Sequence, residues 1–172
     1  AGFVSSPLVS MASGNSSTNI NKIISQYNIS PKILKQGLAA YKWANDHGNV
    51  QNQRYLTLVD LTVHSSQKRL WVIDLKESKV VMNIHVAQGK NSGVDRATSF
   101  SNTPNSEKSS PGIYSTANVY VGKHGTSMRL NGLEKGINDN VMKRAIVVHS
   151  ANYVSSNYIK SHGRAGRSWG CL

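Results

Sequence analysis

Several residue types are scarce in this chain of 172 residues, and each scarcity excludes a class of protein. The single cysteine, Cys171, excludes an intramolecular disulfide. No two histidines have the i, i+4 spacing of a helical zinc site, so we predict no metal and expect no cofactor. No apolar run approaches the roughly 20 residues that cross a bilayer, so we expect a globular chain without a membrane span.

Acidic residues are also few, and this shortage points to the kind of partner. The chain has 20 Lys and Arg against 8 Asp and Glu, which gives a formal net charge of +12. Such a surface attracts a polyanion, which is a nucleic acid, an anionic membrane or an acidic cell-wall polymer. Because the basic residues are scattered and form no nucleic-acid motif, we expect no nucleic-acid binding.

The first third of the chain divides into two parts. Residues 1–19 are rich in Ser, Gly and Asn, which predicts a flexible leader, as in a chain whose export signal has been removed or whose end has been trimmed. Residues 20–53 form a predicted helical segment, in which Ser30-Pro31 signals a helix start and His47-Gly48 a stop.

From Arg54 onward the apolar residues recur with the period of a strand. Residues 55–63, 69–75 and 80–86 predict an antiparallel meander. In the third run, alternation places four apolar residues on one buried face: Val80, Met82, Ile84 and Val86.

The rest of the chain alternates between polar loops and short strands. Residues 88–110 and 123–140 read as long polar loops, separated by a further strand region that includes residues 119–121. Ala145 to Val148 predicts a buried strand that delivers His149 to its end, and a short helix is expected near residues 155–161. The fold class is therefore mainly β, a sandwich or barrel-like pair of sheets with an N-terminal helical segment.

The end of the chain has the composition of a reactive-thiol site. Nucleophilic attack requires the thiolate of Cys171, which a nearby imidazole such as His149 and neighbouring cations favour. Between Asn140 and Leu172 there is no acidic residue, whereas five basic residues are present: Lys143, Arg144, Lys160, Arg164 and Arg167. The alternative is a glycine-rich basic loop that ends in a packed cysteine.

The ordered motifs resemble a known family. His149-Ser150, followed by Gly163-Arg-Ala-Gly-Arg-Ser-Trp-Gly-Cys171, is similar to the active-site signature of the murein L,D-transpeptidase catalytic-domain family, in its Ser-Trp-Gly-Cys branch. Upstream strings such as Ser109-Ser-Pro-Gly-Ile-Tyr114 and Gly122-Lys-His-Gly125 support the resemblance. It covers residues 54–172, the predicted catalytic domain, which we expect to be truncated just after Cys171 because relatives continue past the nucleophile.

The resemblance implies a role for each matching residue. Cys171 matches the nucleophile, His149 the base, and Ser150 the residue whose carbonyl orients the imidazole, while backbone N–H groups around Gly170 and Cys171 match the oxyanion hole. Many relatives have His at the position of Trp169. Any role of that histidine is therefore absent from this chain or taken by another group, such as His124 or His162. We also expect six residues to bind substrate: Tyr114, His124, Arg164, Arg167, Ser168 and Trp169.

In the resembling enzymes the thiolate attacks a peptidoglycan tetrapeptide stem at the L-centre of diaminopimelate, releases D-alanine and holds the stem as a thioester. An amine of a second stem then forms a 3→3 cross-link, whereas water gives L,D-carboxypeptidase activity. We therefore expect peptidoglycan as partner and a periplasmic or exported location. Two alternatives from other classes are a non-catalytic basic domain that binds the cell wall, and a Cys-His amidase that cuts stem peptides.

Overall fold

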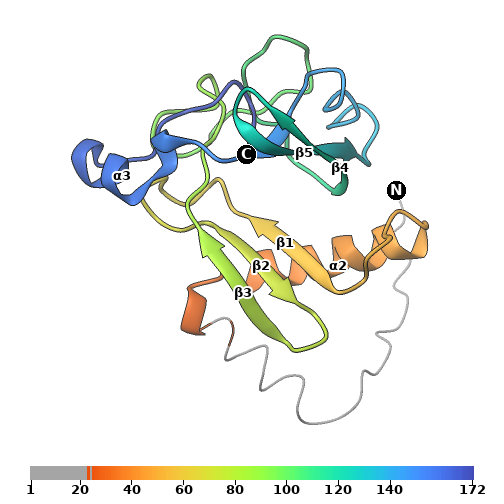
Figure 1. Cartoon of the computed structure of the whole chain (residues 1–172). Coiled ribbons are helices and arrows are strands. Elements are labelled where there is room, and N and C mark those ends of the chain that lie inside the picture. Colours follow the sequence, from red (N-terminus) through yellow and green to blue (C-terminus); the bar gives the residue numbers. More distant parts are fainter. Residues whose placement is uncertain (1–22, 24) are drawn as a thin grey trace.

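The computed structural model describes Ile23 and residues 25–172; the predicted leader over residues 1–19 lies outside the described residues. The helix expected after Ser30 is α2, Pro31–Asp46, and it ends at His47 as its sequence signals predict. Leu34 on α2 packs against Leu58 of the first sheet, within the largest apolar cluster. Figure 1 shows α2 running behind this sheet.

The first sheet contains β1 (Tyr55–Val59), β2 (Leu70–Asp74) and β3 (Lys79–Ile84) in the order β1-β2-β3, with both pairs antiparallel. This arrangement confirms the predicted meander. Burial of Trp71 and Ile73 on β2, against the helical segment, places one core on this side of the molecule.

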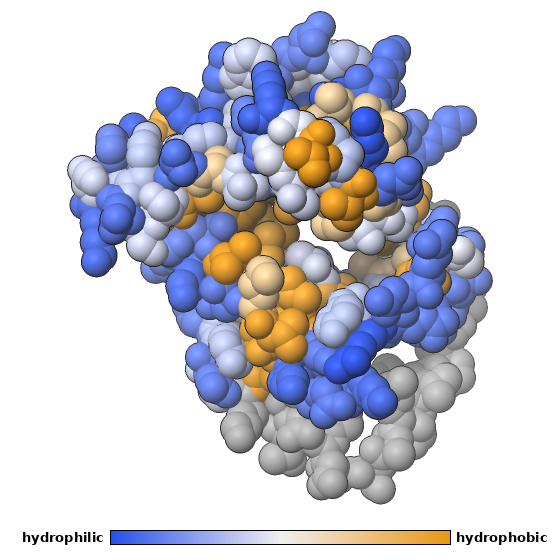
Figure 2. All heavy atoms as spheres, in the orientation of Figure 1, coloured by the Kyte–Doolittle hydropathy of each residue, from blue (hydrophilic) through white to orange (hydrophobic). Residues whose placement is uncertain are grey.

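The predicted face of β3 is wrong in part. Val80 and Val86 are buried, but Met82 and Ile84 are 48% and 42% exposed. The register shifts opposite Val72 and Ile73, where a bulge interrupts simple alternation. Figure 2 shows the resulting cluster of hydrophobic side chains on the surface of the first sheet.

The second sheet contains β4 (Tyr114–Gly122), β5 (Gly125–Gly132) and β6 (Val147–His149) in the order β4-β5-β6, again antiparallel. Strand β5 lies where the sequence predicts a loop. Its buried side chains, Ser127 and Leu130, stand among polar residues and glycines, so no alternating apolar pattern marks it. Strand β6 ends at His149, as predicted.

Two short helical elements follow β6. They are the 3-10 helix η1, Asn152–Val154, and α3, Ser156–His162, which confirms the expected short helix. Figure 1 shows α3 at one side of the molecule, away from β4 and β5. The two three-stranded sheets and few helices confirm the mainly β fold. No helix in the described part of the chain has the length and apolar character needed to cross a bilayer.

The buried side chain of Arg69 joins the connection between β1 and β2 to the segment that follows β3. The Arg69 side chain is fully buried, and its guanidinium donates to the carbonyls of Leu61 (3.3 Å), Val63 (2.8 Å) and Val86 (3.1 and 2.9 Å). Burial lowers the pKa of Arg69 to about 10, partly offset by the charge of Asp60. These bonds fix where the chain leaves β3.

Replacing Arg69 by Met removes four hydrogen bonds from buried carbonyls, so we expect the free energy of unfolding to fall by about 2–4 kcal/mol. Urea denaturation measures this change. The control is Arg96→Met at an exposed position, where the expected change is below about 0.5 kcal/mol. Equal stability of the two variants would contradict a role for Arg69 in holding the fold.

Candidate active site

The turn that carries Cys171 is held by the side chain of Ser168. The buried Ser168 Oγ donates to the carbonyl of Cys171 (2.7 Å) and accepts from the N–H of Gly170 (3.1 Å). Gly170 has φ +117°, and a Cβ there would lie 2.7 Å from Ile146 Cδ1. The backbone at this position therefore requires glycine.

On its N-terminal side the turn is attached to the long loop over residues 88–110. The N–H of Ser168 donates to Gln88 O (2.9 Å), and the N–H of Lys90 donates to Ser168 O (2.8 Å). These bonds form an isolated parallel bridge between Gly89 and Ser168. The loop is therefore part of the site's framework.

On its C-terminal side the turn is attached to β6. The N–H of Leu172 donates to Val147 O, and the N–H of His149 donates to Leu172 O, both at 3.1 Å. The residue after Cys171 thus lies beside the strand that ends at His149. The Leu172 side chain packs against two core clusters, one at the first sheet and one at the second.

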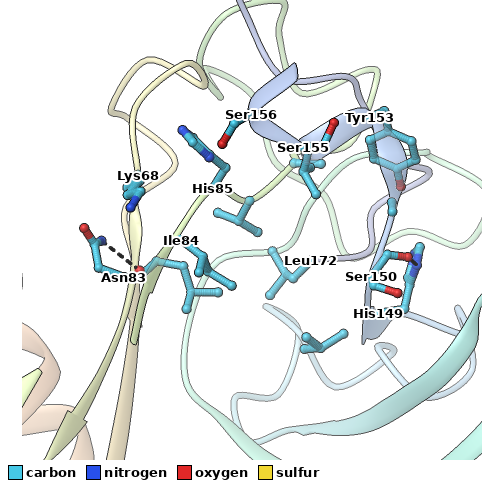
Figure 3. A pocket seen from close by; sticks show the side chains of 16 residues that line it. Lys68, Asn83, Ile84, His85, His149, Ser150, Tyr153, Ser155, Ser156 and Leu172 are labelled. Carbon is cyan, nitrogen blue, oxygen red and sulfur yellow. Dashed lines mark hydrogen bonds between the residues drawn. The ribbon is translucent and has the colours of Figure 1, made fainter. Parts of the chain in front are cut away.

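His149 has a defined orientation and tautomer. Its Nδ1 lies 2.8 Å from the carbonyl oxygen of Ser150, and since a carbonyl only accepts, Nδ1 carries the proton. In the neutral ring Nε2 is then the atom that accepts a proton. Figure 3 shows the His149 ring folded back over Ser150 at the pocket wall.

The Cys171 sulfur is partly exposed and lies 3.8 Å from the carbonyl oxygen of Ala145. Within residues 25–172 no hydrogen bond joins this sulfur to the His149 ring. Catalytic hydrogen bonds are often longer in an unliganded site than in the complex with substrate. Direct proton exchange between the two side chains therefore stays a prediction.

Arg144, which lies just before β6, holds the long loop in place. Its guanidinium donates to Ser101 O (2.7 Å) and Ser106 Oγ (3.1 Å), and also to Ser110 Oγ and Lys108 O. The sequence identifies Arg144 as one of several cations near the thiol, but its contacts join residues more than thirty positions apart, which no local pattern indicates.

The charge of Arg144 also acts on the thiol. Burial lowers the pKa of Arg144, while the negative charges of ionised Tyr114 and Cys171 oppose this shift. Burial also raises the pKa of Tyr153, and the charge of Cys171 raises it further. The pKa values of Arg144 and Tyr153 therefore both respond to the charge of Cys171, which identifies these two side chains as its electrostatic neighbours.

A pocket of about 440 Å³ opens beside His149. Residues 83–87 form one wall, residues 148–151 and 153–156 form the other, and Leu172 lies between them (Figure 3). Burial lowers the pKa of His85, so this ring is neutral at pH 7. The pocket is therefore mostly apolar, with Lys68 as its charged member.

A second pocket, of about 320 Å³, is cationic and lies next to the cysteine turn. It is lined by Lys90, Arg164 and Arg167. Lys90 pairs with Glu107 (2.7 Å), and Arg164 pairs with Asp95 (3.4 Å).

Arg167 donates to the carbonyl of Lys90 (3.1 Å) and has no carboxylate partner among the described residues. It is the cation of this pocket that is best placed to bind an added anion.

The other predicted substrate-binding residues differ in their exposure and their contacts. Tyr114 and Ser168 are structural supports: the Tyr114 hydroxyl donates to Ser110 O (2.9 Å) and its ring packs on the core beneath the site. Trp169 is 71% exposed, with Lys90 Nζ 5.6 Å from its ring centre. The His124 ring stacks on that of His149, with 4.6 Å between centres.

The fold and site define a mainly β protein in which a turn that carries a cysteine is hydrogen-bonded to the strand that ends at a histidine. The model of the L,D-transpeptidase catalytic domain family matches residues 25–172, and the chain belongs to this family. Neither the curated proteins nor the solved structures contain a match to the chain. The domain thus has an L,D-transpeptidase-type activity that modifies peptidoglycan.

Replacing Arg144 by Met removes the cation beside Cys171 and the bonds to the long loop, so we expect alkylation of Cys171 by iodoacetamide at pH 7 to slow by about 5- to 20-fold. The rate is measured by mass spectrometry. Arg144→Lys, which keeps the charge, is expected to fall between Met and the unmodified protein. Lys143→Met is the exposed control, and an equal loss there would contradict a specific role for Arg144.

Proposed function

We propose that this chain is a cysteine L,D-transpeptidase, which acts on peptidoglycan tetrapeptide stems through a thioester at Cys171. The observation that carries the proposal is the fixed His149 ring, whose Nδ1 bond to Ser150 O leaves Nε2 to accept a proton next to the Cys171 turn. A cysteine beside an oriented imidazole is the arrangement that nucleophilic acyl transfer requires.

In the first half-reaction, His149 Nε2 takes the proton of the Cys171 thiol. The thiolate attacks the carbonyl carbon at the L-centre of diaminopimelate, and the peptide bond to D-alanine breaks. The D-alanine nitrogen receives the proton from His149, and the stem remains on sulfur as a thioester. The N–H of Cys171 has no hydrogen-bond acceptor within residues 25–172, so it supports the assignment of an oxyanion donor.

In the second half-reaction, an amine of a second stem loses its proton to His149 Nε2 and attacks the thioester carbonyl. The carbon–sulfur bond breaks, the sulfur regains the proton, and a 3→3 cross-link forms. Water in place of the amine gives L,D-carboxypeptidase activity. A thioester reacts more readily with amines than an oxygen ester does, and this favours cross-linking with a cysteine nucleophile.

The cationic pocket is the proposed binding site for a carboxylate of the stem. Arg167 presents an exposed guanidinium without a carboxylate partner among the described residues, and Lys90 and Arg164 add positive potential. The net charge of +12 favours association with the anionic wall. Because peptidoglycan is assembled outside the cytoplasmic membrane, we propose that the protein acts in the periplasm or in the cell wall.

Replacing Cys171 by Ala is expected to abolish D-alanine release from disaccharide tetrapeptides, because no other group of the site supplies the nucleophile. His149→Gln is expected to lower the rate by about 10²- to 10⁴-fold, since the base is lost. Mass spectrometry of the products separates 3→3 dimers, tripeptides from hydrolysis, and cuts inside the stem. Unchanged release by Cys171→Ala with an unchanged circular dichroism spectrum contradicts the nucleophile assignment.

Replacing Arg167 by Ala is expected to raise KM for the tetrapeptide by about 5- to 30-fold with a small change in kcat, because a charge-assisted contact to substrate is lost. Steady-state kinetics of D-alanine release measure both constants. Lys160→Ala, an exposed cation on α3, is the matched control for net charge. The same KM increase in both variants would show a general charge effect instead of a carboxylate site.

A further inference from the structure

The His124 ring covers one face of the His149 ring. The ring centres are 4.6 Å apart and the planes differ by 23°, a stacked arrangement. The proposed half-reactions use His149 but assign nothing to His124. Two imidazoles in contact at the site of proton transfer require an explanation.

The position of His124 is set by a tight hairpin. β4 ends at Gly122 and β5 begins at Gly125, and these two residues are paired, so only Lys123 and His124 form the loop. Gly125 has φ +78°, a left-handed conformation that glycine adopts readily and other side chains disfavour. The loop therefore presents His124 from a short and constrained connection.

The same hairpin is attached to the strand that carries His149. Ser127 of β5 pairs with His149 of β6, only three residues beyond His124. The Ser127 hydroxyl also donates to Gly125 O (3.1 Å), which ties the loop to β5. The stacking contact is therefore a consequence of sheet register, not of a free side chain that happens to lie nearby.

We propose that His124 is a positioning residue for His149, and this inference rests on the function proposed above. The Nδ1 bond to Ser150 O holds one edge of the ring, but the ring can still tilt about that bond. A flat group against its face fixes the plane, and with it the direction of Nε2. His124 acts through His149 and does not touch the reacting atoms.

This role depends on a planar ring and not on an imidazole nitrogen. A Phe side chain preserves a flat face for stacking but neither donates nor accepts hydrogen bonds. An Ala side chain has neither a flat face for stacking nor a group that forms hydrogen bonds. The pair of variants therefore separates positioning by stacking from direct contact of His124 with substrate or from proton transfer by His124.

The experiment measures kcat and KM for D-alanine release with the full chain and its His124→Ala, His124→Phe and Lys123→Ala variants. We expect His124→Ala to lower kcat about 10-fold with KM within about twofold, since misplacement of a catalytic group acts on the transition state. We expect His124→Phe to recover to within about threefold of the unmodified protein. The exposed neighbour Lys123 is the control and is expected to have no effect.

Unchanged kcat in His124→Ala overturns the proposal, and so does a His124→Phe variant as slow as His124→Ala. Proton NMR of the His149 ring gives a readout that needs no activity: its ring protons are expected to shift in His124→Ala and to keep their ring-current shift in His124→Phe. If the unmodified protein releases no D-alanine, the proposed function fails, whereas the NMR spectra still decide whether His124 holds the ring.

Discussion

The anchoring of Leu172 is the interaction on which the arrangement of the site depends. Its backbone forms two hydrogen bonds with β6, and its side chain packs against apolar clusters at both sheets. This anchor holds the C-terminal side of the turn that carries Cys171. With it, the cysteine is fixed beside the strand that ends at His149, and burial of one aliphatic side chain couples the two halves of the fold.

Two guanidinium groups, those of the fully buried Arg69 and the partly buried Arg144, complete this framework. Arg69 binds carbonyls in the segments that follow β1 and β3, and Arg144, just before β6, binds carbonyls and hydroxyls of the long polar loop. Each arginine donates hydrogen bonds to backbone carbonyls that have no partner in a neighbouring strand. These bonds hold irregular segments of the chain in defined positions. Arg144 also interacts electrostatically with Cys171, so the residue that orders the loop adds positive charge to the site.

The sequence predicted the features that depend on local signals. Helix α2 begins at the predicted proline, β6 lies in a continuous apolar run, and the first sheet follows from period-two segments. Strand β5 was missed because its few buried side chains do not alternate with polar ones, and the exposed Met82 follows from a bulge that no local pattern marks. Clamps such as Arg144 and the stacking of His124 depend on contacts between distant segments, so only the folded chain identifies them.

The most direct test of the central claim is intact-mass analysis of the protein during turnover of a tetrapeptide stem. The account predicts a covalent adduct whose mass equals the stem minus D-alanine, located on Cys171 by peptide mapping, and discharged by an added amine. D-alanine release with no adduct in the unmodified protein or in a slowly deacylating variant, or an adduct on another residue, would contradict it.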